Sequence, residues 1–80
     1  MNKRDDLQDW VLEALTDLNG EGRIVDVAKY IWIHHENELR ASGDLFYTWQ
    51  YDMRWAATKL RESKKILPAN KSQKGIWQLT

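Results

Sequence analysis

Residues 48–65, TWQYDMRWAATKLRESKK, constrain the fold more than any other stretch of this sequence. At about 100° per residue, one side of a helix over this range collects apolar side chains at the spacing of a buried stripe. These side chains are Trp49, Met53, Ala56, Ala57 and Leu60. We therefore expect a long amphipathic helix that buries this stripe and exposes the opposite side.

The opposite side of this expected helix is mostly basic and polar, and it carries two aromatic rings. Its members are Gln50, at the margin, and Tyr51, Arg54, Trp55, Thr58, Lys59, Arg61 and Glu62. Cations interleaved with aromatic rings suit the recognition of a flat, anionic ligand. The alternative is an ordinary solvated helix surface, and for each single residue both interpretations stay open.

The charges of the chain are divided between its two halves. The formal net charge is zero, which by itself argues against a nucleic-acid-binding protein. Residues 1–44, however, hold five Lys and Arg against ten Asp and Glu, a net of −5, whereas residues 45–80 hold seven against two, a net of +5. A globule built from this chain can therefore present one positive face.

Length and composition indicate one small globular domain. Eighty residues suffice for a single core, and Trp10, Trp32, Trp49 and Trp77 are expected to enlarge it. The sequence has no cysteine, which excludes disulfides and thiolate metal sites. It has no apolar run of about 18 residues for a membrane span, and its start lacks the apolar core of a signal peptide. We expect a cytoplasmic protein.

Two further helices are expected in the acidic half. The first covers residues 6–19, with Asp5 or Asp6 as its cap, and buries Leu7, Trp10, Val11, Ala14, Leu15 and Leu18. After a short extended segment at 23–25, Asp26 is expected to cap a second helix that ends near Ala41. Its core stripe is Ala28, Ile31, Trp32, His35 and Leu39. Tyr30 and Ile33 fall on its far side and form a candidate contact with another subunit or domain.

The last segment reads as a β-hairpin. Residues 66–68 and 76–80 are short apolar runs, and the residues between them are polar and carry Lys71 and Lys74. The connector at 43–47 is expected to place Leu45 and Phe46 in the core, with Asp44 or Thr48 capping the helix over 48–65. The element order is then α-β-α-α-β-β, an α+β, mainly helical class with the plan of a winged helix-turn-helix.

The C-terminal half also resembles a known family. Trp55-Ala56 with Leu60, then Ile66-Leu67 and the closing KGIWQLT of residues 74–80, resemble the N-terminal winged-helix domain of Mrr-type restriction proteins. The resemblance is close over residues 48–80 and general over residues 7–42. It implies duplex DNA binding through the third helix and the wing. The nuclease of that family is a separate domain for which this chain has no room.

The expected function is therefore that of a DNA-binding winged-helix module, either a small transcription regulator or the N-terminal domain of a restriction-like protein. The helix would lie in the major groove and the cations would hold phosphates. Cations near a helix C-terminus also complement the helix dipole, so part of the cluster needs no ligand. The expected DNA-binding residues are Gln50, Tyr51, Arg54, Trp55, Thr58, Lys59, Arg61, Lys64, Lys65, Lys71 and Lys74.

Other classes of function are less well supported by the residues. A module for protein interaction or homodimerisation would use Tyr30, Ile33, Tyr51 and Trp55. Glu62-Ser63-Lys64 spells a nuclease E-x-K fragment, but it falls at a helix end without a partner Asp. His34 and His35 point about 100° apart on a helix and cannot share a metal. We expect no enzyme activity, no cofactor, no metal and no small-molecule substrate.

Overall fold

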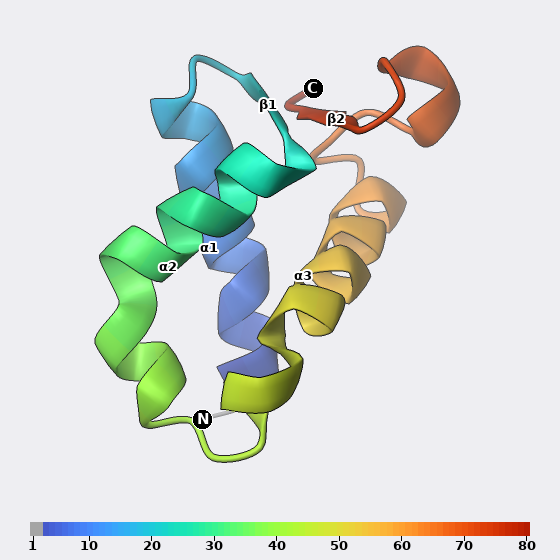
Figure 1. The fold of residues 1–80 in the computed structure, drawn as a ribbon. Helices are drawn as coiled ribbons and strands as arrows, with labels where there is room; N and C mark the ends of the chain where they lie inside the picture. Colours follow the sequence, from blue (N-terminus) through green and yellow to red (C-terminus); the bar gives the residue numbers. More distant parts are fainter. Residues whose placement is uncertain (1–2) are drawn as a thin grey trace.

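The computed structural model describes residues 3–80, which form a mainly helical α+β architecture. Along the chain run α1 (Lys3–Asp17), β1 (Glu21–Arg23), α2 (Ile24–Arg40), α3 (Leu45–Glu62), the 3-10 helix η1 (Ala69–Lys71) and β2 (Ile76–Gln78). Helix α1 lies behind α2 and α3, and β1 and β2 lie side by side at one end of the helices (Figure 1). Among the described residues, no helix is long and apolar enough to cross a membrane.

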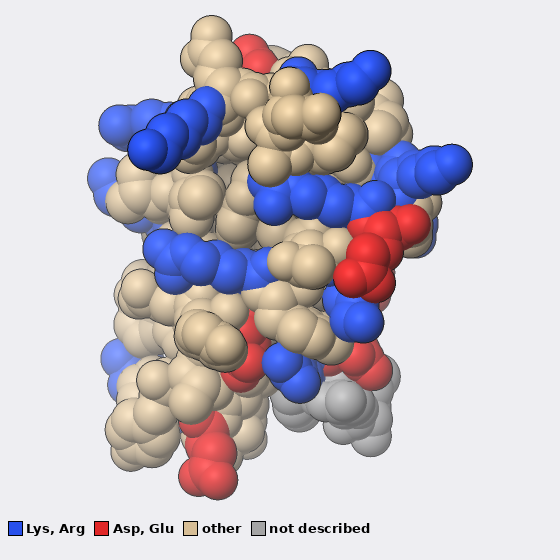
Figure 2. Space-filling model, turned by 90° about the vertical axis from the view of Figure 1, so that its right-hand side faces the viewer, with Lys and Arg blue, Asp and Glu red and all other residues tan. Residues whose placement is uncertain are grey.

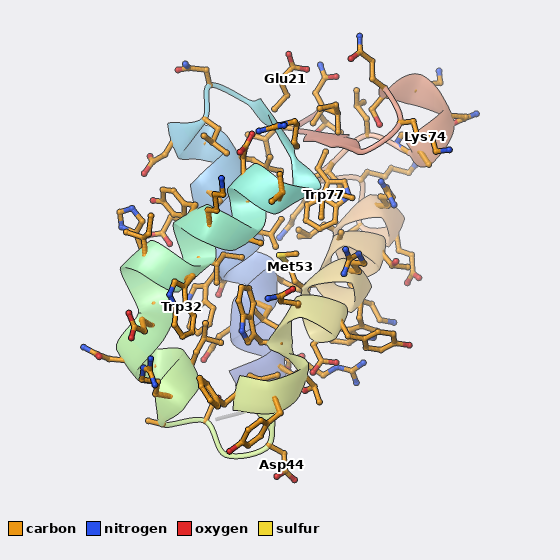
Figure 3. The ribbon with its side chains drawn as sticks, viewed as in Figure 1. Glu21, Trp32, Asp44, Met53, Lys74 and Trp77 are labelled. Carbon is orange, nitrogen blue, oxygen red and sulfur yellow. The ribbon has the colours of Figure 1, made fainter. Side chains whose placement is uncertain are left out.

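The core forms where the apolar stripes of the three helices meet. All five stripe residues expected on α3 are buried, at 7% exposure or less, and so are Leu7, Val11, Ala14 and Leu15 of α1. Figure 3 shows Met53 pointing from α3 into the space among the helices. Trp10, Trp49 and Trp77 are buried in this core, and Trp32 packs half-buried against it. The helical period therefore predicted the α3 stripe correctly, but on α2 it missed the buried Val27, and the expected Ala28, Trp32 and His35 are only partly buried.

Helix α2 differs from the expectation at its start. It begins at Ile24, and the N-cap residue is Arg23, whose side chain makes no capping bond. Asp26 is therefore not the cap: it lies in the first turn and accepts a hydrogen bond from Arg23 Nε at 2.9 Å. Chain continuity from β1 explains the shift, because Arg23 is already extended and the helix starts directly after it. Val27, Ile31 and Leu39 are buried.

The expected exposure of Tyr30 on α2 is wrong. Its side chain is half-buried against the core, its hydroxyl donates a hydrogen bond to the Asp17 carboxylate at the end of α1, and its ring stacks on His34 with centroids 4.0 Å apart. An amphipathic phenol can cover apolar surface and still reach a polar partner, which a helical wheel does not reveal. Ile33 is exposed as expected, at 73%.

Helix α3 starts and ends earlier than expected. Its first residue is Leu45, so the expected connector is its first turn, and Thr48 is not a cap but donates to Asp52 Oδ2 from inside the helix at 2.8 Å. Asp44 occupies the N-cap position without a capping bond from its side chain. The helix ends at Glu62, because Lys64 turns the chain with a φ of 64°. Lys64 and Lys65 therefore follow the helix instead of extending it.

The expected C-terminal hairpin is reduced to one strand and one bridge. Strand β2 pairs antiparallel with β1, with Gly22 opposite Trp77. On the other side, Ile66 makes a single bridge to Leu79. Pro68, which has no N–H for a ladder, follows Leu67, and its carbonyl accepts a hydrogen bond from the Lys71 N–H at 2.9 Å. That bond belongs to η1, so the expected polar tip contains a helical turn.

Candidate nucleic-acid interface

The outer face of α3 presents a row of polar side chains. Gln50, Arg54 and Thr58 are spaced by four residues and are all exposed. Arg54 Nη1 donates to the Gln50 carbonyl at 3.4 Å, and Thr58 Oγ1 donates to the Arg54 carbonyl at 3.2 Å. These bonds hold the Arg54 and Thr58 side chains close to the helix surface. The helical period predicted that these three residues share one exposed face of α3, and they do.

A hollow of about 540 Å³ lies between α3 and the loop formed by residues 69–75, and we call it the basic hollow. Its cationic lining comes from Arg54 and Arg61 of α3 and from Lys74 of the loop. Ile24, Ile76 and Trp77 contribute its apolar lining, and Figure 3 shows Trp77 beside α3 with Lys74 on the loop. The structure therefore brings expected site residues from the helix and from the loop to one concave surface.

Backbone hydrogen bonds fix the loop that carries Lys74. The Ile24 N–H donates to the Gly75 carbonyl at 3.1 Å, and the Ile76 N–H donates to the Gln73 carbonyl at 3.0 Å. Gly75 has a φ of 79°, a conformation that residues with a Cβ rarely adopt. The start of α2 and the start of β2 thus fix the backbone on both sides of Lys74.

Arg61 both stabilises the segment after α3 and contributes positive charge to the basic hollow. Its side chain is half-buried, and Nε donates to the Leu67 carbonyl at 3.3 Å. That bond ties the end of α3 to the segment that follows it. The bond uses one donor, and a guanidinium has five, so Arg61 retains donors for the basic hollow that it lines.

The remaining expected cations do not converge on this hollow. Lys59 pairs with Glu62 at 3.6 Å, whereas Lys64 and Lys65 are exposed after the end of α3. Lys71 lines a different hollow beside Arg23 and Asp26. The two loop lysines, which the sequence suggested would act together, therefore border different surfaces.

The two aromatic residues of the expected face have different surroundings. Trp55 is half-buried, and the Arg4 guanidinium of α1 lies over its ring, 3.9 Å from the centroid. Arg4 also pairs with Asp52 at 3.3 Å. Tyr51 is 74% exposed. The Trp55 ring on α3 therefore packs against Arg4 of α1, and Tyr51 extends into solvent.

Positive charge gathers on the side of the molecule formed by α3 and the loop. Figure 2 shows this side, with several Lys and Arg side chains and few acidic ones. Both carboxylates of residues 45–80, Asp52 and Glu62, lie in ion pairs with Arg4 and Lys59. Neither of these cations lines the basic hollow. The sequence predicted a positive face, and the charges drawn in Figure 2 agree with it.

Sequence reasoning missed an aromatic groove of about 470 Å³ between α2 and α3. Trp32, Phe46 and Trp49 line it, and the Trp32 and Trp49 rings stack with centroids 6.3 Å apart. The stripes of the two helices predicted contact with the core for both tryptophans. They could not show that Trp32 keeps part of its surface exposed beside Phe46.

Sequence reasoning also missed a cluster around His35, where α2 has a kink. His35 Nε2 lies 2.6 Å from Glu13 Oε2 of α1, and Nδ1 lies 2.9 Å from Glu38 Oε1. Burial lowers the pKa of His35, but the hydrogen bonds to the two carboxylates outweigh it, so the pKa is raised overall. No group of three or more His, Cys, Asp or Glu among residues 3–80 is arranged to hold a metal ion.

Comparison of the chain with family models, with curated proteins and with solved structures found no match.

Proposed function

We propose that this chain is a winged-helix module that binds duplex DNA. Helix α3 would enter the major groove, and the loop of residues 69–75 would contact the phosphate backbone as the wing. The module would serve as a small regulator or as the N-terminal domain of a restriction-like protein, as its resemblance to Mrr-type N-terminal domains implies. In this proposal Gln50 and Thr58 face base edges, and the cations around them hold phosphates.

The strand arrangement supports the winged-helix part of the proposal. Strand β2 pairs with β1 along one edge, and Leu79 just after it bridges to residue 66 along the other. The C-terminal segment thus lies between the segment that precedes α2 and the segment that follows α3. The three helices and the pairing of β1 with β2 agree with the expected plan, whereas residues 66–68 form one bridge in place of the expected strand.

The observation that carries the DNA-binding proposal is the convergence of α3 and the loop on the basic hollow. Arg54, Arg61 and Lys74 come from two separate segments and line one concave surface. None of the described residues that line it is acidic. A concave surface with charge of one sign concentrates counter-charged ligands. Convergence of this kind is not needed for solubility, which scattered lysines provide equally well.

The first experiment measures binding to mixed-sequence duplexes at several salt concentrations. Replacing Lys71 and Lys74 together by alanine should weaken binding to all duplexes and lower the salt slope by about 1 to 2 units. Arg40→Ala is the matched control, because it removes an exposed cation that pairs with Glu36, at the far end of α2. Unchanged binding after the double substitution would remove the loop from the proposed interface.

A second candidate function is a protein-interaction or homodimerisation module of the same fold. Large apolar side chains favour it, because Ile33 is 73% exposed, Tyr51 74% and Tyr47 83%. Tyr30 contributes less than the sequence suggested, since it packs half-buried. Sedimentation at low and physiological salt separates the two functions: a salt-insensitive dimer without affinity for duplexes would favour the second.

A further inference from the structure

The basic hollow has a lining that suits an anionic ligand group. It holds two guanidinium groups and one ammonium group, and the loop adds Asn70 and Gln73, whose side-chain amides are hydrogen-bond donors. Guanidinium groups bind phosphate through two parallel hydrogen bonds, and lysine adds a point charge. The rest of the lining is mainly apolar, from Ile24, Ile76 and Trp77. None of the residues that line the hollow carries a carboxylate that would compete for the cations.

Among residues 3–80, the three cations of the hollow lie in no ion pair, and the same holds for Lys29, Lys64, Lys65 and Lys71. Arg4, Arg23, Arg40 and Lys59 each lie within 4.0 Å of a carboxylate oxygen. Within residues 3–80, Arg54, Arg61 and Lys74 make no such pair, and the bonds of the two arginines go to backbone carbonyls. These three positive charges repel one another, and a bound anion would reduce the repulsion.

We propose that the basic hollow is a seat for a phosphate group, in which Arg54, Arg61 and Lys74 converge on one phosphodiester linkage. The inference rests on the proposed function for the source of the phosphate, which is then the backbone of a duplex. It assigns Arg54 to the backbone and not to a guanine base. Direct base readout is left to Thr58, which lines the hollow, and to Gln50, which lies two turns earlier on α3 beside the aromatic groove.

The position of the hollow fits a backbone that passes between the helix and the loop. The DNA sugar-phosphate backbone separates the major groove from the adjacent minor groove. With α3 in the major groove and the loop at the minor groove, this backbone would run between α3 and the loop. The volume of about 540 Å³ exceeds that of a single ion and leaves room for the sugars that flank a phosphate. Backbone hydrogen bonds already fix the loop, so binding has to order mainly its exposed side chains.

The test compares three probes by amide chemical shifts of the full chain: inorganic phosphate, thymidine 5′-monophosphate and mixed-sequence duplexes. We expect all three to shift residues 73–75 and the Trp77 indole N–H. Arg54→Gln and Lys74→Gln should each weaken the duplex complex about tenfold, to a similar extent for duplexes of different sequence. Arg40→Gln removes the same charge at the far end of α2, outside the hollow, and should leave the shifts caused by phosphate and nucleotide unchanged.

Three outcomes separate this inference from the proposed function. Duplex binding without shifts at residues 73–75 would overturn the phosphate seat and leave DNA binding intact. A loss in Arg54→Gln that is confined to duplexes with particular guanines would also overturn it, because Arg54 would then read bases. Binding of nucleotide with no tighter binding of duplex would support the seat and overturn the proposed function, since the phosphate would then come from a small ligand.

Discussion

The imidazole of His35 stacks on the indole of Trp10, with ring centroids 4.2 Å apart and planes inclined by 11°. Both ring nitrogens lie within hydrogen-bond distance of carboxylates, Glu13 from α1 and Glu38 from α2. A neutral imidazole has one N–H and can donate to one of them, whereas the imidazolium can donate to both. The charged form therefore ties α2 to α1 at the kink of α2.

This arrangement predicts a pH-dependent stability. Because the pKa of His35 is raised, its contribution is fully present below the ordinary value of about 6.5 and is lost as the pH rises through the raised pKa. We expect His35→Gln to cost on the order of 1 kcal/mol near pH 6, since the carboxylates are partly solvated, and progressively less as the pH rises through the raised pKa. Denaturant unfolding of both proteins at several pH values measures the difference. A difference in the free energy of unfolding that grows with pH would contradict the prediction. The control is His34→Gln, which replaces an exposed histidine on the same helix.

The hydrogen bond from Tyr30 to Asp17 predicts a late step in the titration of the tyrosines. This bond, with burial and the nearby charge of Glu13, raises the pKa of the Tyr30 phenol to about 12. Its stabilising effect is fully present below the ordinary value of about 10 and disappears as the pH rises through about 12. Absorbance titration should show this step in the unmodified protein and lose it in Tyr30→Phe. A late step that persists in Tyr30→Phe would assign it to another tyrosine.

The left-handed backbone at Lys64 predicts a stabilising substitution. Its φ of 64° ends α3, and this conformation disfavours residues with a Cβ. Lys64→Gly should therefore raise the free energy of unfolding by about 0.5–1 kcal/mol. Lys65→Gly removes the same charge at a neighbouring residue without a positive φ and should not stabilise the protein. Denaturant unfolding of both variants decides, and equal effects would contradict the backbone explanation.

The sequence predicted features that depend on the period of one element and missed those that depend on contact between elements. The stripe from Trp49 to Leu60 was correct because helical spacing alone determines which residues share a side. Asp26 was wrong as a cap because β1 already extends to Arg23, which no local pattern indicates. The basic hollow required the contact between Ile24 and Gly75, and residues so distant in sequence are not related by any period.

The surroundings of Trp55 predict that its ring stabilises the fold more than it contributes to duplex binding. The Arg4 guanidinium lies 3.9 Å from its ring centroid, and Lys59 Nζ lies 5.9 Å away. Replacing Trp55 by leucine keeps an apolar side chain but removes the aromatic ring that attracts these cations, and we expect a loss of stability of about 1–2 kcal/mol. Duplex binding by the folded variant should change less than threefold, since Arg54 and Lys74 are retained. Unfolding curves and binding isotherms, measured well below the unfolding midpoint, separate the two effects. A variant with full stability and much weaker binding would instead place Trp55 against the nucleic acid, where aromatic rings stack on bases.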